Sequence, residues 1–121
     1  MKNILVTGGA GYIGSVLVNK LITSGHQVKV IDDLSNGFKE NIDEKAEFIQ
    51  GSILDNDKLN KALDGVEVVF HLAAKIRVEE GEREPELYNK VNIDGTLNLI
   101  NKCTEKNIKK LVTINLNLTL I

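Results

Sequence analysis

Three glycines near the start of the chain have the spacing of a loop that holds a diphosphate. Gly8, Gly11 and Gly14 follow the apolar run 4–6 and lead into an amphipathic stretch over 16–22. In such a loop one glycine permits the turn at the strand end, one admits the pyrophosphate, and one lets helix and strand pack closely. Backbone N–H groups at the start of the helix then face the phosphates. This order of strand, loop and helix predicts a dinucleotide-binding site.

A carboxylate at the end of the next expected strand, 27–31, indicates which dinucleotide would bind. Asp32 follows that strand and lies about 20 residues beyond the glycine loop. A carboxylate in this position accepts hydrogen bonds from both ribose hydroxyls of an adenosine and repels a 2′-phosphate. The prediction is therefore NAD and not NADP. The alternative is that Asp32 and Asp33 only form a solvated turn before Asn36 and Gly37.

Strand-like and helical patterns alternate along the chain, without an internal repeat or a linker. Alternation of this kind predicts an α/β fold with three layers, in which helices cover both faces of a parallel sheet through right-handed crossovers. The expected strand order is 3-2-1-4-5, with the ligand crevice between the ends of the first and fourth strands. We expect five strands, at 3–7, 27–31, 47–50, 66–72 and 110–115, and three helices, at 12–24, 55–63 and 86–106.

The last of these helices is expected to bury a single apolar stripe. Its members are spaced three and four residues apart, and they are Ile93, Leu97, Ile100 and Cys103. Pro85 suits the start of this helix, and Asp55 can cap the helix before it.

Composition limits the classes of protein that need to be considered. The chain has 121 residues, enough for one domain over 1–121, and its net charge of -2 offers no basic surface for nucleic acid. Its apolar runs are too short for a membrane span or a signal peptide. Cys103 is the only cysteine and is expected to be a packed thiol, and His26 and His71 are too isolated for a metal site. We therefore expect an intracellular, cytoplasmic protein without a metal.

Four motifs, in this order and spacing, resemble a known family. They are TGGAGYIGS at 7–15, DDLSNG at 32–37, HLAA at 71–74 and NIDGT at 92–96. Together they are similar to the extended short-chain dehydrogenase/reductases, and within these to the NAD-dependent nucleotide-sugar epimerases and dehydratases. The resemblance runs from residue 2 to about residue 112 and implies a Rossmann-type fold that binds NAD.

The resemblance also implies which residues contact the cofactor. The pyrophosphate loop would comprise Gly8, Gly11, Tyr12, Ile13 and Gly14; the adenosine would be contacted by Asp32, Asp33, Asn36, Gly37, Ser52 and Ile53; and the remaining contacts would come from Leu72, Ala73, Ala74 and Asn92. Ser52 stands where the family usually has an aspartate near the adenine amine. Two simpler interpretations stay open, because His71 can be a packed or capping histidine and Asn92 a residue on a helix face.

Catalysis in this family is carried by a tyrosine followed by a lysine four residues later. Tyr12 and Tyr88 are the only tyrosines, and Val16 and Asn92 occupy the positions four residues beyond them. We therefore expect no catalysis by this chain alone and interpret it as the N-terminal, NAD-binding part of a truncated family member. A full-length form would also bind a nucleotide-sugar. The alternatives are a non-catalytic NAD-binding or sensing module and an assembly unit.

The last residues, 113–121, alternate polar and apolar side chains. Such alternation is typical of a strand with one solvated face. We expect this segment to extend the fifth strand and to form a homodimer through it. The alternative is a poorly ordered chain end, as is common at termini.

Overall fold

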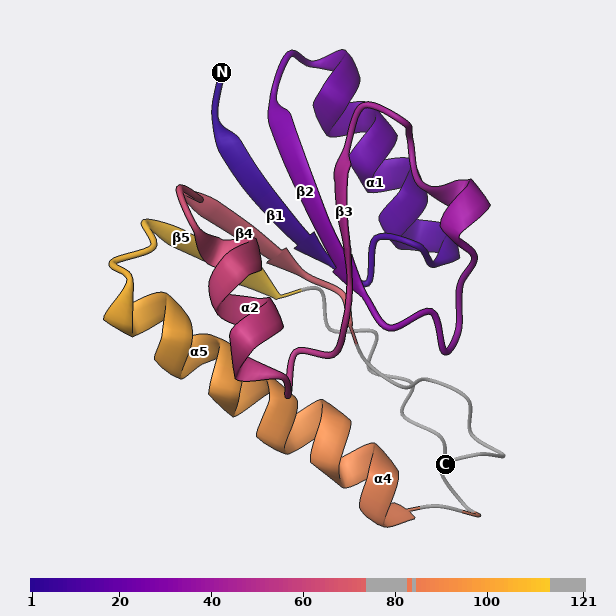
Figure 1. Cartoon of the computed structure of the whole chain (residues 1–121), viewed down its shortest axis with the longest axis vertical. Helices are drawn as coiled ribbons and strands as arrows, with labels where there is room; N and C mark the ends of the chain where they lie inside the picture. Colours follow the sequence, from indigo (N-terminus) through magenta and orange to yellow (C-terminus); the bar gives the residue numbers. More distant parts are fainter. Residues whose placement is uncertain (74–82, 84, 114–121) are drawn as a thin grey trace.

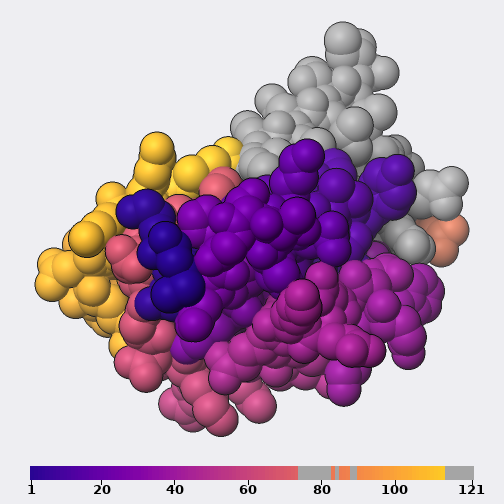
Figure 2. Space-filling view, turned by 90° about the horizontal axis from the view of Figure 1, so that it is seen from above, coloured from indigo at the N-terminus to yellow at the C-terminus, as the bar shows by residue number. Residues whose placement is uncertain are grey.

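The computed structural model describes residues 1–73, 83 and 85–113, and its strands form one parallel sheet (Figure 1). The strands are β1 (Asn3–Thr7), β2 (Gln27–Asp32), β3 (Glu47–Gln50), β4 (Val68–His71) and β5 (Lys110–Thr113). Their order is β3-β2-β1-β4-β5, which confirms the predicted order. In Figure 2 the magenta residues around β3 and the yellow residues around β5 accordingly lie on opposite sides of the molecule.

Helices cover both faces of this sheet, as the alternating pattern predicts. They are α1 (Tyr12–Thr23), α2 (Asn56–Leu63), α4 (Pro85–Asn89) and α5 (Thr96–Glu105), with a short 3-10 turn, η1 (Lys39–Asn41), and a π-helical turn, η2 (Lys90–Gly95). Figure 1 shows α1 on one face of the sheet and α2 with α5 on the other. Helices α4 and α5 are joined through η2, so the expected single helix over 86–106 contains a π-helical turn.

Two apolar cores lie between these layers. Leu5, Ile31 and Val69 face α2 and α5, whereas Val6 and Val30 face α1. Successive residues of a strand point to opposite faces, so the central strands β1 and β2 need apolar side chains on both sides. This double burial explains the apolar run 4–6 in β1 and the apolar residues at 28, 30 and 31 in β2.

Strand and helix ends follow from local hydrogen bonds. The Asp55 carboxylate accepts from the N–H groups of Asp57 and Lys58 at 3.1 and 3.2 Å, which confirms the predicted cap of α2. Pro85 begins α4, also as predicted. Strand β4 is shorter than expected because the Val66 N–H donates to Leu63 O and so belongs to the turn after α2. The expected extension over 114–121 lies outside the described residues.

The predicted buried stripe of the last helix is correct at Cys103 and wrong at its other three positions. Ile93, Leu97 and Ile100 are exposed, whereas Leu99 is buried together with Cys103. Gly95 continues the buried stripe at a spacing of four, and a Cβ there would lie 2.8 Å from Ile53 Cδ1. The helix therefore has two apolar stripes, and the one that contains glycine and cysteine is buried because these small residues let α5 approach the opposite layer closely.

Candidate functional site

The glycine loop joins β1 to α1 and packs tightly against its surroundings. Gly8 has a φ of 74°, its N–H donates to Ile31 O at 2.9 Å, and its carbonyl accepts from Gly11 N at 3.3 Å. A Cβ on Gly14 would lie 2.2 Å from Gly8 O, and one on Gly8 would lie 2.8 Å from the carbonyl carbon of Leu72. Two of the three predicted positions therefore admit only glycine because of protein contacts alone.

Gly11 differs from the other two glycines. A Cβ there would meet only Gly8 O, at an ordinary contact distance of 3.5 Å, so no close protein contact requires a glycine. Gly11 is also the N-cap of α1, where no side chain caps the helix and no acidic residue occupies the first turn. The first N–H groups of a helix have no partner within it and carry partial positive charge. This end of α1 is therefore suited to an anion that approaches the backbone at Gly11.

The Asp32 carboxylate lies at the end of β2 and faces the same loop. Its Oδ2 accepts from Ala10 N at 2.9 Å, and its Oδ1 accepts from Leu34 N at 2.8 Å. Each carboxylate oxygen has two acceptor positions, so both can still accept a hydrogen bond from a ligand hydroxyl. Asp32 is consequently neither a purely solvated turn residue nor committed only to a ligand, because it also fixes the loops beside it.

One pocket of about 420 Å³ opens at the carboxyl ends of the first four strands. Its size is within the usual range of small-molecule sites. Twelve of the predicted site residues line it: Gly8, Gly11, Tyr12, Ile13, Gly14, Asp32, Asp33, Asn36, Ser52, Ile53, Leu72 and Ala73. These residues come from four separate sequence segments and meet around one cavity.

The remaining predicted residues have other positions. Gly37 packs on Ala10 and, like Asn92, is not among the residues that line this pocket, and Ala74 lies outside the described residues. Sequence reasoning missed four residues of the lining, which are Ile31, Ser35, Gly51 and Val91. Ile31 lies one residue before the end of β2, and Gly51 directly follows β3. Both could have been found from the rule that ligands bind at the carboxyl ends of parallel strands. Val91 could not, because it belongs to the π-helical turn η2.

The side of the pocket formed after β3 is fixed by α5. The Asn98 amide donates to Ile53 O and to Asn56 Oδ1, both at 2.8 Å. The Ser52 hydroxyl accepts from Leu54 N at 3.1 Å. The backbone at Ile53 is therefore held by Asn98 of α5, which also bonds to the Asn56 side chain at the start of α2.

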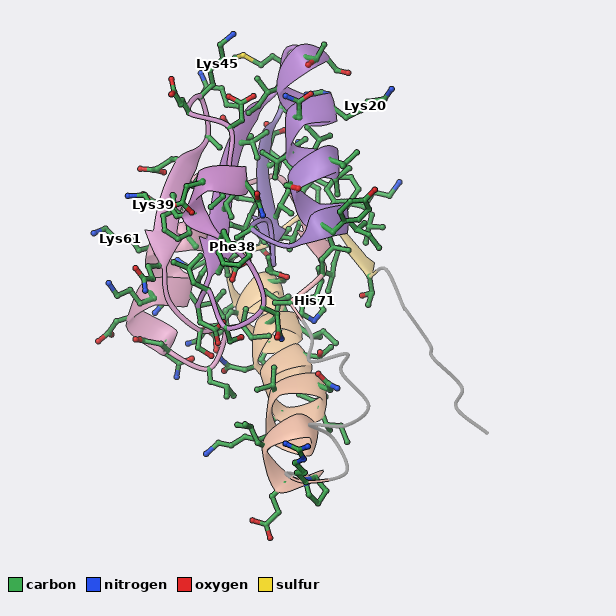
Figure 3. All side chains as sticks on the ribbon, turned by 90° about the vertical axis from the view of Figure 1, so that its right-hand side faces the viewer. Lys20, Phe38, Lys39, Lys45, Lys61 and His71 are labelled. Atoms are coloured by element: carbon green, nitrogen blue, oxygen red, sulfur yellow. The ribbon has the colours of Figure 1, made fainter. Side chains whose placement is uncertain are left out.

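His71 is buried where the sheet meets α5 (Figure 3) and does not line the pocket. Its Nδ1 lies 2.7 Å from Thr7 Oγ1 and its Nε2 lies 2.9 Å from Thr96 Oγ1. Thr7 Oγ1 also accepts from Leu72 N and Ala73 N, at 2.9 and 3.0 Å. Burial lowers the pKa of His71 to about 4. The histidine is thus the packed residue that the simpler interpretation describes, and it connects β1, β4 and α5 beside the pocket.

The described residues show no other reactive centre. Cys103 is buried, and burial raises the pKa of its thiol, so it is a packed cysteine. In residues 1–73, 83 and 85–113 no group of three or more His, Cys, Asp or Glu side chains could hold a metal ion. Within those same ranges, no helix combines the length and hydropathy needed to cross a membrane.

Comparisons with known proteins agree with this geometry. The model of the NAD dependent epimerase/dehydratase family matches residues 4–115. A UDP-glucose 4-epimerase from Mycolicibacterium smegmatis is 40% identical over 114 residues, which cover 89% of this chain and 36% of that protein. Among solved structures, the UDP-glucose 4-epimerase of Thermotoga maritima with UDP-glucose has a TM-score of 0.88 at 44% identity, over 92% of this chain and 37% of that one.

A second solved structure, the UDP-glucose 4-epimerase of Thermus thermophilus in complex with NAD, has a TM-score of 0.85 at 35% identity. The match includes 90% of this chain and 36% of that protein. The chain thus spans little more than a third of the relatives it matches, and it corresponds to the N-terminal, NAD-binding part of UDP-glucose 4-epimerase-like proteins. By its sequence and its fold, the chain belongs to the NAD dependent epimerase/dehydratase family.

Proposed function

We propose that the pocket binds NAD, with the pyrophosphate at the start of α1 and the adenosine ribose at Asp32. One observation carries the proposal: the glycine loop, Asp32 and the ends of β3 and β4 line a single cavity. The NAD complex of the Thermus thermophilus relative supports it, as does the family to which the chain belongs.

Each group has a role that follows from its chemistry. The N–H groups of Tyr12 and Ile13, at the positive end of α1, would donate to the pyrophosphate oxygens. The Asp32 oxygens would accept the ribose hydroxyls while they keep their bonds to Ala10 and Leu34. Adenine would lie beside Ser52 and Ile53, and Leu72 and Ala73 would line the cofactor beyond β4. Bound NAD supplies hydride acceptance and return.

For the whole protein we propose a nucleotide-sugar epimerase or dehydratase, such as a UDP-glucose 4-epimerase. The identities to such enzymes support this, and the substrate would be a nucleotide-sugar like the UDP-glucose of the Thermotoga maritima complex. The 121 residues contain no tyrosine with a lysine four positions later. We therefore assign cofactor binding to this chain, and not the proton transfer of the reaction.

Calorimetric titration of the chain with NAD and with NADP tests the cofactor assignment. We expect saturable NAD binding and much weaker NADP binding, because Asp32 would repel the 2′-phosphate. Asp32→Asn should weaken NAD binding by roughly 10- to 100-fold, the range for a charged hydrogen bond. It should also reduce the ratio of NAD affinity to NADP affinity. The control is Asp43→Asn, since Asp43 also accepts a backbone hydrogen bond in a loop, from Lys45 N, but does not line the pocket. Absence of NAD binding, or equal affinity for NADP, would refute the assignment.

Two further proposals concern the setting of the protein. The alternation over 113–121 supports a homodimer formed through the fifth strand, and sedimentation that shows a monomer at all concentrations would exclude it. A single, buried cysteine supports a cytoplasmic location, where thiols stay reduced.

A further inference from the structure

Ala10, in the middle of the glycine loop, is held by the connection that follows β2. The Ala10 N–H donates to Asp32 Oδ2 at 2.9 Å. The Ala10 carbonyl accepts from Phe38 N at 3.3 Å and from Asn41 Nδ2 at 3.2 Å. We propose that Asn41 is a positioning residue for NAD binding, which sets the geometry of the glycine loop through the Ala10 carbonyl. This inference rests on the proposed function.

The connection lies directly on the peptide group that joins Ala10 to Gly11. A Cβ on Gly37 would be 2.4 Å from Ala10 O, 2.6 Å from Ala10 C and 2.9 Å from Gly11 N, so no side chain fits between the two segments. Ala10 is itself fully buried. The close approach of Gly37 and the bond from Asn41 therefore act on the same peptide group.

The effect of that peptide extends to the start of α1. A peptide group is planar, so the bond that orients the Ala10 carbonyl also orients the Gly11 N–H. This N–H donates to Gly8 O at 3.3 Å and closes the turn of the loop. Gly11 is the N-cap of α1, and the N–H groups proposed to bind the pyrophosphate follow it. A change at Asn41 thus reaches the phosphate site without any contact to the cofactor.

Asn41 contacts the glycine loop but does not line the pocket, whereas Asp32 contacts the loop and also lines the pocket. Asp32 both fixes Ala10 and lines the pocket, so its replacement removes a ligand contact and a loop contact together. Asn41 ends η1, has an exposed side chain and is not among the pocket residues. Phe38 and Lys39, labelled in Figure 3, mark the segment from which it reaches the loop. A variant at Asn41 consequently isolates loop geometry from ligand contact.

The matched control for Asn41 is Asn19. Its side chain is also exposed, and its amide donates to Asp43 Oδ2 at 3.1 Å, so it ties α1 to the same connection at a place that does not involve Ala10. Leucine has the branching of asparagine but no donor. Asn41→Leu and Asn19→Leu therefore each remove one side-chain hydrogen bond of similar length, which is part-buried for Asn41 and exposed for Asn19, and keep the shape of the side chain.

The experiment measures two quantities in the full chain: NAD affinity by calorimetry and the amide nitrogen resonance of Gly11 by NMR without ligand. We expect Asn41→Leu to weaken NAD binding about three- to tenfold, the size of one ordinary hydrogen bond, and to shift the Gly11 resonance. Asn19→Leu should change the affinity by less than about twofold on the same scale and leave that resonance in place. Thermal unfolding of both variants checks that they are folded to the same extent.

The outcomes separate this inference from the proposed function. If the wild-type chain binds NAD and Asn41→Leu binds it equally well, the positioning role is refuted. An unmoved Gly11 resonance refutes it as well, because the Ala10 carbonyl would then not depend on Asn41. A wild-type chain that binds no NAD refutes the proposed function, and the Gly11 resonance still decides whether Asn41 sets the loop.

Discussion

Lowering the pH should destabilise this fold through His71. Thr7 Oγ1 accepts from two backbone N–H groups, so its two acceptor positions are used and its own hydrogen points to His71 Nδ1. Neutral His71 then carries its proton on Nε2 and donates it to Thr96 Oγ1, 2.9 Å away. Protonation would place a second N–H against the Thr7 hydroxyl, which has no acceptor position left. Contacts and burial thus both favour the neutral ring.

The size and sign of the effect follow from proton binding. The pKa of His71 falls from 6.5 to about 4 on folding, so between these values the unfolded chain binds a proton that the folded chain does not. The free energy of unfolding therefore decreases as the pH falls from 6.5 towards 4. The contribution of neutral His71 to this free energy is complete only above pH 6.5. At pH 5 the loss is about 2 kcal/mol, and it approaches about 3 kcal/mol below the folded pKa.

Denaturant unfolding at several pH values, with His71→Asn as the comparison, measures this effect. The asparagine carbonyl can accept from Thr7 but does not titrate. We expect the variant to be less stable at pH 7 because it loses packing, yet to lose about 2 kcal/mol less than the wild type between pH 7 and pH 5. Carboxylates contribute equally to both proteins and cancel in the difference. If the two proteins showed the same pH dependence, or if NMR titration gave His71 a pKa near 6.5, the reasoning would be wrong.

Two further substitutions test how the fold supports the site. Gly9→Ala would place a Cβ 2.6 Å from Val30 Cγ1, and overpacking against this stiff, buried valine should cost about 1–3 kcal/mol in unfolding free energy. The cost should be smaller in a Val30→Ala background. An equal cost in that background would contradict the steric explanation. Asp55→Ala removes the cap of α2 and should cost about 0.5–2 kcal/mol in denaturant unfolding. Asp55→Ser should recover most of that loss, and a serine variant as unstable as alanine would argue against the cap.

Much of the fold could be predicted because burial on both faces leaves a clear pattern. Strand β1 has the apolar run 4–6, β2 has apolar residues at 28, 30 and 31, and the glycine loop stands between a strand and a helix. The residues that line the pocket follow from the same rule, since the ends of parallel strands meet at one edge of the sheet. Gly8 and Gly14 were predicted for reasons that the steric contacts confirm.

The burial of α5 could not be predicted from apolar spacing. Leu97 and Ile100 satisfy the helical period as well as Leu99 and Cys103 do, so hydropathy alone does not decide between the two stripes. Interlayer distance decides, because Gly95 admits Ile53 at a separation that a larger residue would prevent. The small residues Gly95 and Cys103 were the available signal in the sequence. They decide which stripe is buried, although the stripe with Leu97 and Ile100 has the larger apolar area.

The hydrogen bonds that fix the loops around the pocket could not be predicted from sequence patterns either. They indicate which substitutions should affect NAD affinity. Four side chains bond, from distant parts of the sequence, to the backbone of loops that line or flank the pocket, and they are Thr7, Asp32, Asn41 and Asn98. Each joins positions more than 20 residues apart, and such pairs leave no periodic trace in a sequence. The two apolar cores are formed by other side chains, whereas the positions of Ala10, Ile53 and Leu72 depend on these bonds. Thr7 is buried in β1 and also supports the fold through His71. Loss of the bond from Asp32, Asn41 or Asn98 should therefore reduce NAD affinity more than it reduces the free energy of unfolding.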